Sequence, residues 1–219
     1  MPATYSPLRY PGGKTKFYTY VKELLECNNL IGETYMEPFA GGAGLALKLL
    51  LKNDVSRIVI NDLDPAVYSF WHSILNETPE FCDRIFNTPL TQAEWKKQRE
   101  IYLLQDITKP LDLGFATFFL NRTNVSGVVK GGIIGGQEQT GKYKLDSIQT
   151  SDSMSKALSA REVISILMNR FGNEWKIFIP TIRTEMFLLA VSTTMYLLNN
   201  DGMDQLPYLQ EQNTDKNPH

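Results

Sequence analysis

The 219-residue sequence contains few cysteines, few histidines and no long apolar run. Only Cys27 and Cys82 are present, which argues against a disulfide framework, and two histidines cannot assemble a His/Cys metal cluster. We therefore expect no bound metal. The apolar runs are too short to cross a bilayer, and the N-terminus lacks the charged-then-apolar pattern of a signal peptide. These absences predict a cytoplasmic protein with no membrane partner.

The sequence also lacks a strong excess of charge of either sign. Its formal net charge of -2 argues against a protein that coats nucleic acid with a generally basic surface. A local basic face on a neutral body can still hold DNA, so the net charge leaves DNA binding open. With 42% hydrophobic residues, the chain is large enough to bury the core of one domain with a small insertion. The sequence does not indicate an oligomeric state.

A glycine-containing loop is predicted near the N-terminus, where residues 9–14 read Arg-Tyr-Pro-Gly-Gly-Lys. The two adjacent glycines let the backbone pass close to another group, and Lys14 follows at once. The apolar spacing of residues 16–27 then predicts a helix. Taken alone, the motif is also compatible with an ordinary Pro-Gly turn.

A strand, a glycine-rich turn and a helix are predicted over residues 34–51. The segment begins Thr-Tyr-Met-Glu-Pro-Phe-Ala-Gly-Gly-Ala-Gly, and small residues at such a turn let a cofactor lie against the backbone beside a helix N-terminus. The glycines do not match the dinucleotide fingerprint G-x-G-x-x-G. A purely structural turn is therefore an open alternative.

A second apolar strand, residues 57–61, ends at Asp62. A carboxylate at this position can accept hydrogen bonds from both ribose hydroxyls of a nucleotide-type cofactor, so Asp62 is the best single candidate for a cofactor contact. Asp64 is interpreted instead as the N-cap of a helix over residues 66–75, with Pro65 at its first position.

The region after residue 91 combines basic side chains with glycines. Helices are predicted over residues 92–104 and 113–120, followed by Asn-Arg-Thr-Asn-Val-Ser-Gly at residues 121–127. Residues 128–136 carry four glycines, lysines lie at positions 130, 142 and 144, and Glu138 is the single acid between residues 121 and 144. This composition suits an exposed hairpin or loop that touches phosphates and base edges, although a structural glycine loop is the alternative.

Taken together, these motifs resemble the Dam-like (D12 class) DNA adenine-N6 methyltransferase family in type, order and spacing, over residues 6–146. The resemblance implies an α/β fold: a Rossmann-like S-adenosylmethionine-dependent methyltransferase sheet with an inserted helical and hairpin target-recognition region. Residues 1–90 would form the N-terminal, cofactor-binding part of the catalytic domain, and residues 91–146 the target-recognition region. Residues 147–219 would form a C-terminal segment that we cannot align to the family.

The resemblance also implies ligands and the residues that contact them. The cofactor is S-adenosyl-L-methionine, and six residues inherit contacts to it: Tyr10, Lys14, Glu37, Phe39, Gly41 and Asp62. The partner is double-stranded DNA, and five residues of the recognition region are candidates to contact it: Arg122, Asn124, Ser126, Lys130 and Lys142. Tyr10 stands where several members have tryptophan, so an aromatic face is kept.

The family's catalytic tetrapeptide, Asp-Pro-Pro-Tyr, does not occur in this sequence, nor do Asn-Pro-Pro or Ser-Pro-Pro. In the family, its acid and a backbone carbonyl accept hydrogen bonds from the adenine amine while its tyrosine stacks on the flipped base. Catalytic residues are therefore not assigned. The abrupt loss of resemblance after Asp146 suggests a frameshifted or recombined end. Residues 161–171 still have helical spacing, residues 175–179 suit a strand, and residues 187–198 suit either.

The predicted function is site-specific methylation of adenine N6 in DNA, in a setting such as restriction-modification. One alternative is a catalytically inactive remnant that binds cofactor or DNA. Another is a nucleotide-dependent oxidoreductase or a small-molecule methyltransferase built on the same strand, turn and helix. The motif at residues 9–14 and the Asn-Arg motif at 121–122 disfavour this last class, because neither has a place in those folds.

Overall fold

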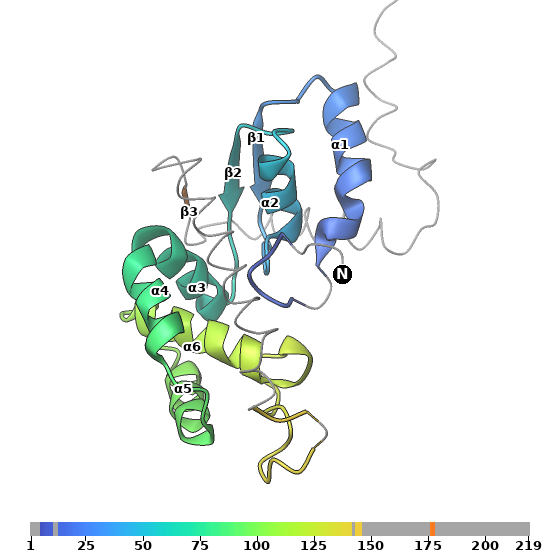
Figure 1. Cartoon of the computed structure of the whole chain (residues 1–219). Helices are drawn as coiled ribbons and strands as arrows, with labels where there is room; N and C mark the ends of the chain where they lie inside the picture. The colour runs from blue at the N-terminus through green and yellow to red at the C-terminus, as the bar shows by residue number, and fades with distance from the viewer. Residues whose placement is uncertain (1–4, 11–12, 142, 146–175, 178–219) are drawn as a thin grey trace, which may run out of the picture. The chain divides into compact units, whose positions relative to one another are not determined.

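A three-stranded parallel sheet lies at the centre of the part of the chain that the computed structural model describes, residues 5–10, 13–141, 143–145 and 176–177 (Figure 1). The strands are β1 (Thr34–Glu37), β2 (Arg57–Ile60) and β3 (Lys176–Ile177), in the order β1-β2-β3. Glu37 pairs with Ile60 in the register of β1 and β2. Both strands predicted before residue 62 are confirmed, and β3 lies inside the strand predicted over residues 175–179.

The helices agree with most of the sequence predictions. In chain order they are η1 (Lys14–Phe17), α1 (Tyr18–Cys27), α2 (Gly44–Leu51), α3 (Pro65–Asn76), α4 (Thr78–Asn87), α5 (Gln92–Leu104), α6 (Pro110–Thr123) and η2 (Val125–Gly127). The sequence analysis missed α4, in which Phe81 is the one buried residue. It also ended α6 too early, because residues 121–123 continue the helix. The predictions over residues 161–171 and 187–198 lie outside the described residues.

The turn from β1 into α2 lies between two buried elements. Most of α2 is buried, including Leu45, Leu47 and Leu50, because the helix is apolar around most of its circumference. Val59 and Ile60 of β2 are also buried. The glycine-rich turn is therefore held between a buried helix and a buried sheet, which fixes the position of its backbone.

The start of α3 follows the prediction made from its capping residues. The Asp64 side chain accepts a hydrogen bond from the Ala66 backbone N–H (2.9 Å), and Pro65 occupies the first turn. The Asp64 cap satisfies an otherwise unpaired backbone donor, while Pro65 has no N–H to satisfy. This cap fixes the point at which the chain leaves β2 and enters α3.

Helices α3 and α6 pack closely around an aromatic cluster. Phe70 of α3 stacks on Phe118 of α6 with ring centroids 6.0 Å apart, and Phe81 of α4 meets both rings edge to face. The helices approach closely at Gly114, where an added Cβ would lie 2.5 Å from the Ser69 carbonyl oxygen. This cluster anchors α6 and the loop that follows it.

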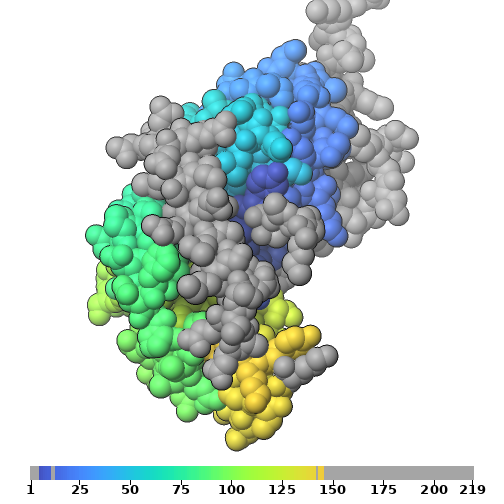
Figure 2. Space-filling model, viewed as in Figure 1, coloured from blue at the N-terminus to red at the C-terminus, as the bar shows by residue number. Residues whose placement is uncertain are grey.

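The segment after α6 is an irregular loop with little strand pairing. Among the described residues, the strand pairing of this segment is limited to one antiparallel bridge between Asn124 and Ile133. Gly135 and Gly136 have positive φ values of 82° and 74°, a conformation that glycine adopts without strain. Of the alternatives of hairpin or loop, the structure shows a loop, drawn in yellow in Figure 2.

No helix in the described part of the chain is both long and apolar enough to cross a bilayer. Within the same residues, no group of three or more His, Cys, Asp or Glu side chains is placed to hold a metal ion.

Candidate cofactor site

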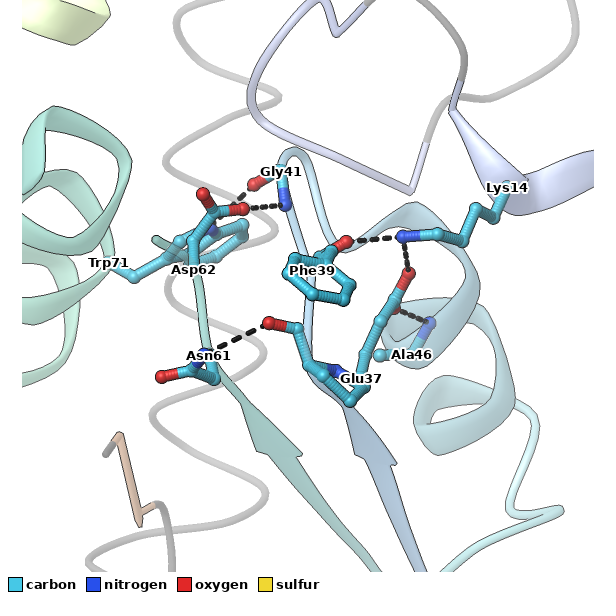
Figure 3. A network of polar contacts seen from close by, with 9 residues as sticks. Lys14, Glu37, Phe39, Gly41, Ala46, Asn61, Asp62 and Trp71 are labelled. Carbon is cyan, nitrogen blue, oxygen red and sulfur yellow. Dashed lines mark hydrogen bonds and ion pairs between the residues drawn. The ribbon is translucent and has the colours of Figure 1, made fainter. Parts of the chain in front are cut away.

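Acidic side chains gather where β1 and β2 end. Because the two strands are parallel, their carboxyl ends meet at one edge of the sheet, which is where open α/β sheets bind ligands. Glu37 is the last residue of β1, and Asn61 and Asp62 follow β2 directly. Figure 3 shows these side chains around the turn that contains Phe39 and Gly41.

Asp62 holds the glycine-rich turn through its carboxylate. Oδ2 accepts a hydrogen bond from the Gly41 N–H (2.7 Å), and Oδ1 accepts one from the Asp64 N–H (3.0 Å). Gly41 has φ of 49°, the left-handed conformation that glycine tolerates best. Each carboxylate oxygen has two lone-pair directions, so Asp62 keeps acceptor capacity for two further donors.

Glu37 and Lys14 form an ion pair behind this turn. The Glu37 side chain is 3% exposed; its Oε1 accepts from Lys14 Nζ (2.9 Å) and its Oε2 from the Ala46 N–H (3.2 Å). Lys14 Nζ also donates to the Phe39 carbonyl. Burial raises the pKa of Glu37, and the Lys14 ammonium offsets only part of that effect. Lys14 therefore joins the N-terminal motif to the end of β1.

Tyr10 lies against Gly41 and is near Asp62. A Cβ added to Gly41 would be 2.6 Å from Cε1 of the Tyr10 ring, so only glycine permits this approach. Tyr10 is 45% exposed, and burial followed by the charges of Asp62 and Asp64 raises the pKa of its hydroxyl. The structure thus brings together all six predicted cofactor residues through a continuous set of contacts.

Three further residues shape this site and were missed by the sequence analysis. Trp71 Nε1 donates to the Gly41 carbonyl (2.8 Å), and Asn61 Nδ2 donates to the Pro38 carbonyl (3.0 Å). Tyr102 of α5 is buried, and burial, the Asp64 charge and Tyr10 raise its pKa. Trp71 and Tyr102 occupy ordinary buried helical positions, so nothing in the sequence pattern distinguishes them from core residues.

Asn121 connects the N-terminal motif to the end of α6. Its Oδ1 accepts from the Arg9 N–H (2.8 Å), and its Nδ2 donates to the carbonyls of Arg9 (2.8 Å) and Gly127 (2.7 Å). A Cβ added to Gly127 would lie 2.7 Å from Cβ of Arg9, so the two backbones are in close contact. The first and last motifs of the resemblance are therefore one structural unit.

Two of the predicted DNA contacts have their side chains engaged within the protein. Asn124 is 1% exposed; its Oδ1 accepts from Trp95 Nε1 (2.7 Å) and its Nδ2 donates to backbone carbonyls including Val129 (2.8 Å). Arg122 donates to the Pro7 carbonyl, and its guanidinium lies over the Phe118 ring. Both side chains hold the loop in place.

The remaining predicted DNA contacts include two exposed side chains. Ser126 and Lys130 are exposed on the loop after α6, and Ser126 has a positive φ of 56°. Lys142 lies outside the described residues. Ser126 and Lys130 are therefore the predicted contacts that the structure places at the surface.

The architecture defines a mixed α/β protein whose small parallel sheet carries acidic side chains at the carboxyl ends of its strands. A model of the D12 class N6 adenine-specific DNA methyltransferase family matches residues 10–175, and the chain belongs to this family. The comparison with curated proteins finds no match. The family implies a methyltransferase fold, and its members use S-adenosylmethionine.

The family match extends beyond the motifs that we recognise in the sequence. The resemblance that we recognise ends at Asp146, whereas the match continues to residue 175. Residues 147–175 therefore belong to the matched region, and β3 begins directly after it.

Proposed function

We propose that this chain binds S-adenosyl-L-methionine at the carboxyl ends of β1 and β2 and methylates adenine N6 in double-stranded DNA. The observation that carries the proposal is the Asp62 carboxylate at the tip of β2, fixed against the Gly41 turn by a 2.7 Å hydrogen bond. Membership in a family of adenine-specific DNA methyltransferases supports the choice of reaction.

The side chains of the site suit this cofactor chemically. Asp62 can accept hydrogen bonds from the ribose hydroxyls with its remaining lone pairs. The Lys14 ammonium keeps one N–H donor for the carboxylate of the methionine part. Glu37 is buried and bonded to Lys14 and Ala46, so we assign it to holding Lys14 in place. Tyr10 and Phe39 offer aromatic faces. When bound, the cofactor supplies an electrophilic methyl group on a sulfonium.

On the DNA side, we propose that the loop after α6 contacts the duplex. Ser126 and Lys130 are exposed there, and we assign Lys142 to the same role. Arg122 and Asn124 are proposed to act through the conformation of this loop, since their hydrogen bonds hold it to Pro7 and to Trp95. In this assignment residues 1–90 bind the cofactor and residues 91–146 recognise the target.

A second function, binding of cofactor and DNA without methyl transfer, is favoured by one observation. The tetrapeptide Asp-Pro-Pro-Tyr, which would hold and polarise the adenine amine, is absent from the sequence. The family match argues against the third alternative, a nucleotide-dependent oxidoreductase or a small-molecule methyltransferase.

Two measurements on the full chain test these functions. Isothermal titration calorimetry with S-adenosylmethionine measures cofactor binding, and tritiated methyl transfer to unmethylated double-stranded DNA measures activity. DNA already methylated at adenine N6 is the control substrate. Transfer to the first DNA alone supports the methyltransferase, whereas binding without transfer supports the second function. Failure of the full chain to bind S-adenosylmethionine would refute the proposed site.

A further inference from the structure

A cavity of about 430 Å³ lies between the end of α5 and the loop after α6. Six described residues line it: Arg99, Tyr102, Leu103, Gln105, Val129 and Lys130. None of them belongs to the six predicted cofactor residues, and one of them, Tyr102, also lies near the candidate cofactor site. The volume falls in the range of about 300 to 1,000 Å³ that is typical of small-molecule sites.

The charges at this cavity favour an anion. Arg99 and Lys130 are the charged residues of its described lining, and both are cationic at neutral pH. Arg99 is held in place because its guanidinium donates to the Gly131 carbonyl (3.0 Å) and lies 5.1 Å from the Trp95 ring centroid. The guanidinium keeps further N–H donors that match the geometry of a phosphate.

Two acids adjoin lining residues along the chain. Glu100 follows Arg99, is exposed, and forms no ion pair with Arg99 or Lys130 among the described residues. Asp106 follows Gln105. Its carboxylate accepts hydrogen bonds from the Thr108 N–H (3.1 Å) and hydroxyl (2.6 Å), and it lies 3.8 Å from Lys109 Nζ. Asp106 is therefore already paired and does not neutralise Arg99 or Lys130. The cavity keeps a net positive lining.

The rest of the lining suits a flat, partly apolar group with polar edges. Leu103 is 65% exposed at the rim, and Val129 and the Tyr102 ring add apolar surface. The Gln105 amide nitrogen donates to the Tyr102 carbonyl (2.6 Å), which leaves the amide oxygen as an acceptor. Nucleobases combine a π-face with hydrogen-bonding edges, so an apolar wall beside one fixed amide is a suitable surface for binding them.

We propose that this cavity is a second ligand site that binds a nucleoside monophosphate unit, with its phosphate at Arg99 and Lys130 and its base against Leu103 and Val129. The unit has two possible sources that share this chemistry, a free nucleotide and a nucleotide of an unpaired DNA strand. The inference does not depend on S-adenosylmethionine binding at Asp62.

The test measures the affinity of the full chain for thymidine 5′-monophosphate, thymidine and inorganic phosphate by calorimetry. Because the proposed site uses both the base and the phosphate, we expect the monophosphate to bind about tenfold more tightly than either part. Leu103→Glu introduces a negative charge at the rim and should weaken monophosphate binding by about tenfold. Lys130→Gln removes one cation and should weaken it by about fivefold.

Matched control variants separate a local effect from a general one. Leu104→Glu makes the same change at the next residue, which is 76% exposed and outside the cavity lining. Lys96→Gln removes an exposed cation of α5 that is likewise outside it. Both controls should stay within about twofold of the unmodified chain. Equal losses in Leu103→Glu and Leu104→Glu, or no loss in Leu103→Glu and Lys130→Gln, would overturn the proposal.

A short single-stranded oligonucleotide distinguishes the two sources. Displacement of the monophosphate by the oligonucleotide assigns the site to a DNA strand, and lack of displacement assigns it to a free nucleotide. S-adenosylmethionine binding is measured in parallel and should be unchanged in Leu103→Glu. If the cofactor fails to bind but the monophosphate binds as expected, the proposed function falls and this inference stands.

Discussion

Replacement of Asp62 by alanine tests the candidate cofactor site most directly. The carboxylate accepts hydrogen bonds from Gly41 N–H (2.7 Å) and Asp64 N–H (3.0 Å), so Asp62→Ala removes both. Asp62 is only half-buried, and water can replace part of what is lost. We expect the free energy of unfolding to fall by about 1.5 to 3 kcal/mol, the range for hydrogen bonds to charged groups.

Asp62→Ala should also weaken cofactor binding, because the same carboxylate is lost. Loss of the charged hydrogen bonds to the ribose should weaken binding by about 1.5 to 3 kcal/mol, or roughly 12- to 160-fold. At a cofactor concentration of about 100 times the Kd of the unmodified chain, S-adenosylmethionine should stabilise that chain by about 2.7 kcal/mol. At the same concentration, Asp62→Ala should gain only about 0.3 to 1.3 kcal/mol.

The assay is urea unfolding with and without S-adenosylmethionine, accompanied by calorimetry. Asp83→Ala is the matched control, because Asp83 is an exposed acid on α4 away from the strand ends. Its cofactor affinity should match that of the unmodified chain. If Asp62→Ala is folded and binds S-adenosylmethionine with unchanged affinity, Asp62 does not hold the ribose and the reasoning is refuted.

Three further substitutions test the packing and hydrogen bonds around the site. Gly114→Ala should lower the free energy of unfolding in urea by about 1 to 3 kcal/mol, because its Cβ would collide with the α3 backbone. Trp71→Phe should lower the same quantity by about 1 to 3 kcal/mol, because it leaves the buried Gly41 carbonyl without its donor. Burial and the hydrogen bond to Asp54 raise the pKa of Tyr18 to about 12. The Tyr18 hydroxyl therefore keeps its proton in the folded chain at a pH near 10, where the unfolded chain loses it. Stability should therefore fall as the pH rises from about 10 towards 12, and urea unfolding across this range should show a smaller fall in Tyr18→Phe.

The local features of the fold could be predicted from the sequence. The strand β2 is a short apolar run, and β1 leads directly into a glycine-rich turn. Such signals act over a few positions. The cap of α3 at Asp64 is equally local, because the side chain reaches a backbone N–H two residues away. The position of Asp62 at the strand tip followed from these elements, and the structure places it there.

The features that the sequence analysis missed depend on contacts between distant segments. Asn124 was interpreted as a surface residue in a glycine-rich loop, but it is buried because Trp95 of α5 supplies a donor 29 residues away. Tyr102 of α5 is buried because α5 packs against α6, a contact between separate segments. Neither relation has a signature in the local pattern of residues.

Long-range hydrogen bonds join motifs that lie far apart in the sequence of this chain. Asn121 binds both the N–H and the carbonyl of Arg9 across 112 positions of the sequence, and Lys14 binds Glu37 across 23. The N-terminal motif is thus fixed at one end by the helix that leads into the recognition loop and at the other by the first strand. A change in either anchor displaces Tyr10, which rests on Gly41 beside Asp62. The candidate cofactor site and the loop after α6 are therefore both joined to the N-terminal motif by these hydrogen bonds.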